Sequence, residues 1–170
     1  LYAQLREDTT NRLLDLGTKG SGTTPFSRSG DGRLTLKGAA REILASEYLN
    51  ALSVNSYKIL SVFETEEQLH RNDEPSPTRA AVLVRLSHSH IRIGSFQRLA
   101  YLNLPQEIHT LARYVARYYY PDIDPESPTE ALLLALLESL VICVAEMVAG
   151  WMASGFVHGV LNTDNFNLTG

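Results

Sequence analysis

The sequence predicts an α+β fold in which strands occupy mainly the first hundred residues and helices occupy the rest. Three observations support this class. Two short segments, YKILSVFETEE and AAVLVRLS, are rich in apolar and β-branched residues. A glycine-, serine- and threonine-rich turn region, residues 17–33, precedes them. The last third of the chain is mostly a long apolar run of helical character.

The composition narrows the possible classes of protein. The chain has 170 residues, enough for one domain or for a piece of a larger one, with 44% hydrophobic residues and a formal net charge of −4. This mildly acidic balance lacks the basic character of nucleic-acid-binding proteins, so we expect no nucleic-acid partner. The single cysteine, Cys143, cannot form an intrachain disulfide, which favours a reducing compartment. No signal-peptide pattern opens the sequence.

In the first half, NRLLDL (residues 11–16) predicts a strand that enters the glycine-rich turn. From about Thr35 the pattern becomes helical, with apolar residues at three- and four-residue steps at Ala40, Ile43, Leu44, Tyr48 and Leu52. YKILSVFETEE and AAVLVRLS then predict two strands, separated by the polar, proline-containing loop HRNDEPSPTR.

In the second half, helices are predicted at residues 105–120 and from about Pro128, with Ser127 as N-cap and Pro128 at the first helical position. The segment from Ala131 to Val157 has the length of a membrane span, but it contains Glu138 and Glu146. An ionised carboxylate at the bilayer centre costs about 2.5–3.5 kcal/mol. We therefore expect a long, mostly buried helix of a soluble domain and no membrane partner.

The segment GTKGSGTT (residues 17–24) does not fit a nucleotide-binding P-loop. Gly17 and Gly22 have the required spacing, but Thr23 stands where the lysine must follow the last glycine. The alternative is a strand lysine, Lys19, that contacts phosphates and pairs with a carboxylate of the following helix. Glu42 is the preferred partner over Glu47. On the pattern alone, a solvated lysine and a surface glutamate are the more economical interpretation.

Two further segments are candidate phosphate sites. GDGR (residues 30–33) places backbone N–H groups beside Asp31 and Arg33, although an ordinary Asp-Gly turn has the same sequence. Arg85 and Arg92 lie seven residues apart and can grip a phosphate or form structural ion pairs. The histidines between these arginines lack a third metal ligand at suitable spacing, so we assign them to structure or solvent.

The segment HGVLNTDN has the outline of a kinase-like catalytic loop, with His158 and Asn165 at the usual separation. The position of the usual base holds Val160, which cannot accept a proton. Asp164 offers a carboxylate as the base, and the Asn165 amide oxygen suits a hard cation. An Asx-rich turn is the alternative. The order of elements, from a lysine-bearing strand through a helix and strands to this loop, is that of a kinase core.

Four motifs in the same order, KGSGTTPFSRSGDGR, REILASE, EPSPTRAAVLVRLSHSHIRIGSF and FVHGVLNTDN, resemble the selenoprotein O family. These kinase-like proteins are called pseudokinases because the usual base is missing. The resemblance covers Lys19 to Asn165. It implies a two-lobed, protein-kinase-like fold, with residues 1–100 forming part of the N-lobe sheet with its helix and residues 101–170 forming the start of the helical C-lobe.

The resemblance also implies an activity. Family members bind ATP in a flipped orientation and transfer AMP to Ser, Thr or Tyr hydroxyls of proteins, and uridylylation has been proposed for bacterial members. A bacterial cytoplasm or a mitochondrial compartment follows from the same likeness. The implied roles are nucleotide binding for Lys19, Asp31, Gly32, Arg85 and Arg92, pairing with the lysine for Glu42, proton acceptance for Asp164, and Mg²⁺ or Mn²⁺ binding for Asn165.

The family pattern extends beyond both ends of this sequence. Members have a glycine-rich nucleotide-binding segment upstream of residue 1, and an Asp-Tyr-Gly segment after the last residue whose Asp is a second metal ligand. We therefore expect an internal fragment that is inactive and poorly folded alone. The competing functions are a conventional kinase, which Val160 argues against, and a non-catalytic nucleotide-binding scaffold.

Overall fold

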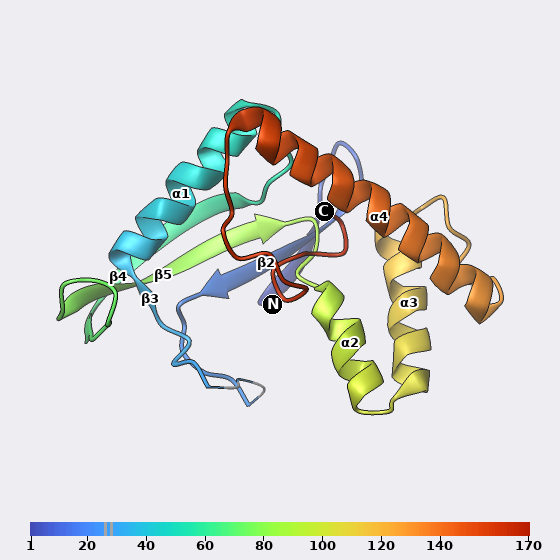
Figure 1. The fold of residues 1–170 in the computed structure, drawn as a ribbon, viewed down its shortest axis with the longest axis horizontal. Helices are drawn as coiled ribbons and strands as arrows, with labels where there is room; N and C mark the ends of the chain where they lie inside the picture. Colours follow the sequence, from blue (N-terminus) through green and yellow to red (C-terminus); the bar gives the residue numbers. More distant parts are fainter. Residues whose placement is uncertain (26, 28) are drawn as a thin grey trace. The chain divides into compact units, whose positions relative to one another are not determined.

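A computed structural model of the chain describes residues 1–25, 27 and 29–170 (Figure 1). The described residues form an α+β structure with a five-stranded sheet and four helices, in agreement with the predicted class. They divide into two compact units. The first contains Leu1–Gln4 and Asp15–Ser87, and the second contains Leu5–Leu14 and His88–Gly170.

The sheet is organised around one central strand. Its strands are β1 (Ala3–Arg6), β2 (Leu13–Lys19), β3 (Leu34–Thr35), β4 (Lys58–Leu69) and β5 (Thr78–Ser87). Strand β5 pairs antiparallel with β4, and also with β2 and β3 along successive stretches. In β2, Gly17 lies opposite Arg85 and Lys19 lies opposite Leu83. Because side chains alternate along a strand, Lys19 and Arg85 project from the same face of the sheet.

Helix α1 (Leu36–Ala51) packs across β4 and β5 (Figure 1). It begins where the sequence predicts, and the Thr35 side chain caps it by accepting a hydrogen bond from the backbone N–H of Gly38 at 3.0 Å. Ala39 of this helix is fully buried in a cluster with Ala81 and Leu83 of β5. This packing holds α1 on the face of the sheet that carries Lys19.

The second unit contains α2 (Ile93–Tyr101), α3 (Pro105–Tyr119) and α4 (Thr129–Ser154). Its buried core consists of Ala112, Val115, Ala116, Leu132, Leu136 and Leu168. The predicted N-cap of α4 is wrong by one residue. Pro128 is itself the N-cap, because its φ of −51° and ψ of 138° are not helical. The Ser127 hydroxyl instead lies 3.4 Å from the carboxylate of Asp124.

The prediction that helix α4 is mostly buried is wrong. Only 11% of its most apolar 18-residue window is buried, and Leu134, Val141 and Ile142 are largely exposed. A helix that is apolar all round needs neighbours on every side, whereas Leu132 and Leu136 are its only buried positions among the described residues. By length and composition α4 is the one helix in the described part of the chain that could cross a membrane, which is weak evidence by itself.

Candidate functional site

The first unit brings Lys19 and Glu42 together. Lys19 is the last residue of β2, and its Nζ forms an ion pair with Oε1 of Glu42 in the first half of α1. The lysine side chain is 45% exposed and the glutamate 18% exposed, so the pair lies at the edge of solvent with its carboxylate largely covered. Glu47, the other carboxylate considered, is exposed. The ammonium group is thus fixed by the helix and remains accessible to a ligand.

The glycine-rich turn region closes on itself at Gly22 and Gly32. The backbone N–H of Gly22 donates to the Gly32 carbonyl at 3.0 Å. Gly32 has a φ of +67°, and a Cβ added there would lie 2.2 Å from the Gly22 carbonyl oxygen. Only glycine satisfies both the left-handed backbone and this close approach. The preceding residue, Asp31, accepts a hydrogen bond from the backbone N–H of Arg33 at 2.9 Å.

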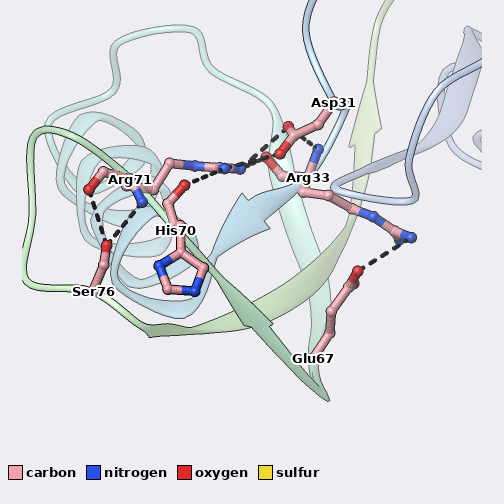
Figure 2. A network of polar contacts seen from close by, with 6 residues as sticks. All are labelled: Asp31, Arg33, Glu67, His70, Arg71 and Ser76. Carbon is pink, nitrogen blue, oxygen red and sulfur yellow. Dashed lines mark hydrogen bonds and ion pairs between the residues drawn. The ribbon is translucent and has the colours of Figure 1, made fainter.

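Asp31 also belongs to a polar network centred on Arg71 (Figure 2). Arg71 Nη1 lies 2.8 Å from Asp31 Oδ2, and Nη2 donates to the Arg33 carbonyl at 3.3 Å. Arg71 is held in turn by Ser76, because the Ser76 hydroxyl accepts a hydrogen bond from the backbone N–H of Arg71 at 2.8 Å. The backbone hydrogen bond from Arg33 and then Arg71 lower the pKa of Asp31. The carboxylate is therefore ionised at neutral pH and orders the turn.

A Gly32→Ala substitution is expected to lower the free energy of unfolding by about 1–2 kcal/mol or more. A left-handed backbone costs a non-glycine residue about 1–2 kcal/mol, and the new methyl group also collides with Gly22. Denaturant unfolding measures the effect. Gly30→Ala is the matched control, because a Cβ added at Gly30 would meet no atom within 4 Å and its φ is not positive. Equal stability of the two variants would contradict the prediction.

Arg85 is connected to the ion pair of Lys19 and Glu42 by one intervening side chain, that of Tyr57. Its guanidinium carbon is 5.3 Å from the centroid of the Tyr57 ring, and its Nε is buried with no hydrogen-bond partner among the described residues. The Tyr57 hydroxyl donates to Oε2 of Glu42 at 2.9 Å. The first unit therefore groups two of the predicted phosphate-binding cations, Lys19 and Arg85, around one carboxylate and one tyrosine.

In the second unit, the start of α2 holds the segment that contains Asp164. Main-chain hydrogen bonds run from Ile93 N to Phe166 O at 3.1 Å and from Gly94 N to Thr163 O at 2.9 Å. The Arg92 guanidinium donates to the main-chain carbonyl of Asp164. Arg92 is thus engaged with the loop itself, and its predicted role in holding phosphates stays a prediction.

The loop presents the side chains of Asp164 and Asn165 side by side in sequence, and both residues are exposed. Asn162 Oδ1 accepts from the backbone N–H of Asp164 at 3.0 Å, which fixes an Asx-type turn. The Asn165 amide nitrogen donates to the Val160 carbonyl at 2.9 Å. This bond orients the amide and leaves its oxygen as the group available to a cation. The donor chemistry therefore fits an Mg²⁺ or Mn²⁺ ligand.

Comparisons with known proteins identify the family. The family model described as "Protein adenylyltransferase SelO" matches residues 1–170, the whole chain. This chain belongs to the SelO family. Two similar relatives are both called "Protein nucleotidyltransferase YdiU". The one from Synechocystis sp. is 51% identical over 170 residues, with 100% of this chain and 35% of the relative covered. The one from Gloeobacter violaceus is 53% identical over 169 residues, with 99% and 34% covered.

A third YdiU relative, from Trichormus variabilis, is 52% identical over 170 residues, which cover 100% of this chain and 34% of the relative. The chain thus spans about a third of the length of the curated SelO-family relatives it matches. No group of three or more His, Cys, Asp or Glu side chains suited to a metal ion occurs in the part of the SelO-family chain that the structure describes. His88 and His90 accordingly belong to no such group.

Three residues that lie against candidate site residues, each within its own unit, were missed at the sequence level. Tyr57 precedes a strand, Arg71 lies in a polar loop, and Gly94 lies in the short, unpredicted helix α2. Gly94 is informative because a Cβ there would lie 2.2 Å from Oδ1 of Asp164. No local pattern marks any of the three, since each acquires its role only through contacts with distant segments.

Proposed function

We propose that this chain is part of a protein adenylyltransferase with a protein-kinase-like fold, which transfers AMP from ATP to Ser, Thr or Tyr hydroxyls of proteins. The first unit would correspond to part of the N-lobe, and the second would include the start of the helical C-lobe. The observation that carries the proposal is the Asp164–Asn165 pair in a loop whose usual base position is Val160. The SelO-family match over the whole chain supports it.

The proposed roles follow from the chemistry of the side chains. Lys19, Gly32 and the turn ordered by Asp31 bind the nucleotide, with Glu42 orienting the lysine. The Asp164 carboxylate takes the proton from an acceptor hydroxyl. The hydroxyl oxygen then forms a bond to the α-phosphorus of ATP, the bond from that phosphorus to the bridging oxygen breaks, and pyrophosphate leaves with the electron pair.

Charge that develops on the leaving pyrophosphate requires cationic partners. Arg85 and Arg92 are proposed to supply them, together with the metal ion. A bound Mg²⁺ or Mn²⁺ would neutralise phosphate charge, and Asn165 would hold it through its amide oxygen. The ion-paired Lys19 supplies a further positive charge, which Glu42 keeps in a defined place.

A labelling experiment tests the proposal. The full-length protein is incubated with Mg²⁺ or Mn²⁺, mixed acceptor proteins, and ATP labelled on either the α- or the γ-phosphate. Protein should become labelled from α-labelled ATP only, since AMP retains the α-phosphate and pyrophosphate carries the γ-phosphate away.

The same experiment separates the alternatives. Label from the γ-phosphate would instead identify a conventional kinase. ATP binding without any transfer would identify a non-catalytic scaffold, and label from α-labelled UTP in preference to ATP would identify a uridylyltransferase. Any of these three results would contradict AMP transfer.

A further inference from the structure

We propose that Tyr57 is a positioning residue that holds the side chains of Glu42 and Arg85 in the relative positions that phosphate binding requires. This inference rests on the proposed function. Tyr57 touches both groups from one side chain. Its hydroxyl donates to Glu42, and its ring face lies beneath the Arg85 guanidinium. The ion pair of Lys19 with Glu42 and the guanidinium of Arg85 are thereby connected through a single residue.

The backbone explains why Tyr57 reaches both groups. Ile59 lies opposite Arg85 in the β4–β5 ladder, and Tyr57 lies two residues before Ile59. Residues two apart share a face of the sheet, and a diagonal neighbour is within reach of an aromatic side chain. On the other side, the Asn50 side-chain amide donates to the carbonyls of Ser46 at 2.7 Å and Tyr57 at 3.3 Å. The end of α1 is thus tied to the main chain of Tyr57.

The two oxygens of the Glu42 carboxylate have separate partners. Oε1 pairs with Lys19, and Oε2 accepts the Tyr57 hydroxyl at 2.9 Å. Burial, followed by the nearby Glu42 charge, raises the pKa of Tyr57 well above its ordinary value. The hydroxyl therefore stays protonated at neutral and mildly alkaline pH and remains a donor. With one oxygen fixed by Tyr57, the carboxylate cannot rotate away from the lysine without losing this bond.

The contact with Arg85 is made mainly by the ring. A guanidinium over an aromatic face is held by the ring's quadrupole, which leaves N–H groups for other acceptors. Arg85 Nε is buried and has no hydrogen-bond partner among the described residues. Tyr57 thus restrains the arginine without occupying Nε.

Two substitutions separate the contributions of hydroxyl and ring. In the full-length protein, Tyr57→Phe removes the hydroxyl bond and keeps the ring, whereas Tyr57→Leu removes both. We expect Tyr57→Phe to lower kcat/KM for AMP transfer about tenfold, the loss of one hydrogen bond to a charged group, and Tyr57→Leu to lower it further. Tyr101→Phe is the matched control, because Tyr101 is 89% exposed in the second unit.

A double substitution distinguishes positioning from general destabilisation. In a Glu42→Gln background, Tyr57→Phe should have little additional effect on kcat/KM, because the carboxylate that it orients is already gone. Independent, full effects of the two substitutions would overturn the proposal. An unchanged kcat/KM of Tyr57→Phe in the wild-type background would overturn it as well.

A readout that needs no activity keeps this proposal separate from the proposed function. The rate at which an amine-reactive reagent modifies Lys19, measured by mass spectrometry without nucleotide, should rise in Tyr57→Phe and not in Tyr101→Phe. A rise in a protein that transfers no AMP would support the positioning role and contradict the proposed function. An active protein with no change in Lys19 reactivity would overturn the positioning role alone.

Discussion

Under the proposed adenylyltransferase mechanism, replacing Asp164 by alanine is expected to lower AMP transfer by the full-length protein by about 10²–10⁴-fold, the usual contribution of a general base. Val160 occupies the usual base position, so no carboxylate there can substitute for Asp164. ATP binding should be retained, because Lys19 and the turn at Gly32 are unchanged. The rate of label transfer from α-labelled ATP measures the first effect, and calorimetry measures the second.

Asp164→Asn is a useful second variant, because it keeps the shape of the side chain and removes its basicity. It should be as inactive as Asp164→Ala. Asp122→Ala is the control, since Asp122 is an exposed carboxylate of the α3–α4 connection. Transfer by Asp164→Ala within a few-fold of the wild-type rate would remove Asp164 from the role of base.

Replacing Gly94 by alanine is expected to lower AMP transfer about 100-fold, the loss associated with a displacement of a reacting group by about 1 Å. The added Cβ would lie 2.2 Å from Oδ1 of Asp164 and 3.3 Å from the Thr163 carbonyl oxygen. Gly94 is buried at the start of α2, so the carboxylate must move rather than the helix. The measurement is again label transfer from α-labelled ATP.

The Gly94 prediction needs a control for the general effect of exchanging glycine for alanine. Gly30→Ala serves, since a Cβ at that position meets no atom within 4 Å. Thermal unfolding of both variants shows whether the fold is retained. A folded Gly94→Ala protein with wild-type transfer would mean that the reaction uses a different position of Asp164.

Strands β4 and β5 were predictable because apolar, β-branched runs mark them in the sequence. The pairing of Lys19 with Glu42, which the structure contains, was implied only by the family resemblance, because the local pattern alone favoured a solvated lysine. Tyr57 was not predictable in the same way. Its place beside Arg85 depends on the β4–β5 register, which contains irregularities between Ile59 and Ser61 and between Glu64 and Gln68. No sequence pattern specifies such bulges.

The same distinction applies to the second unit. The long helix α4 was predicted from its apolar run, but its burial was overestimated. An apolar sequence favours burial of a helix and does not show which elements pack against it. The spacing of Asp164 and Asn165 indicated a catalytic loop. The contacts of Arg92 and Gly94 with the loop that carries Asp164 were not predicted. They join segments about seventy residues apart, through the Arg92 guanidinium and the Gly94 backbone N–H.

The main-chain hydrogen bonds between the start of α2 and the loop that carries Asp164 have a consequence for how this loop tolerates mutation. The bonds from Ile93 N to Phe166 O and from Leu168 N to Ile91 O join main-chain atoms only. Such bonds are indifferent to the identity of the side chains on either segment. These bonds therefore remain possible with other side chains at the same positions, whereas a Cβ at Gly94 would meet the Asp164 carboxylate.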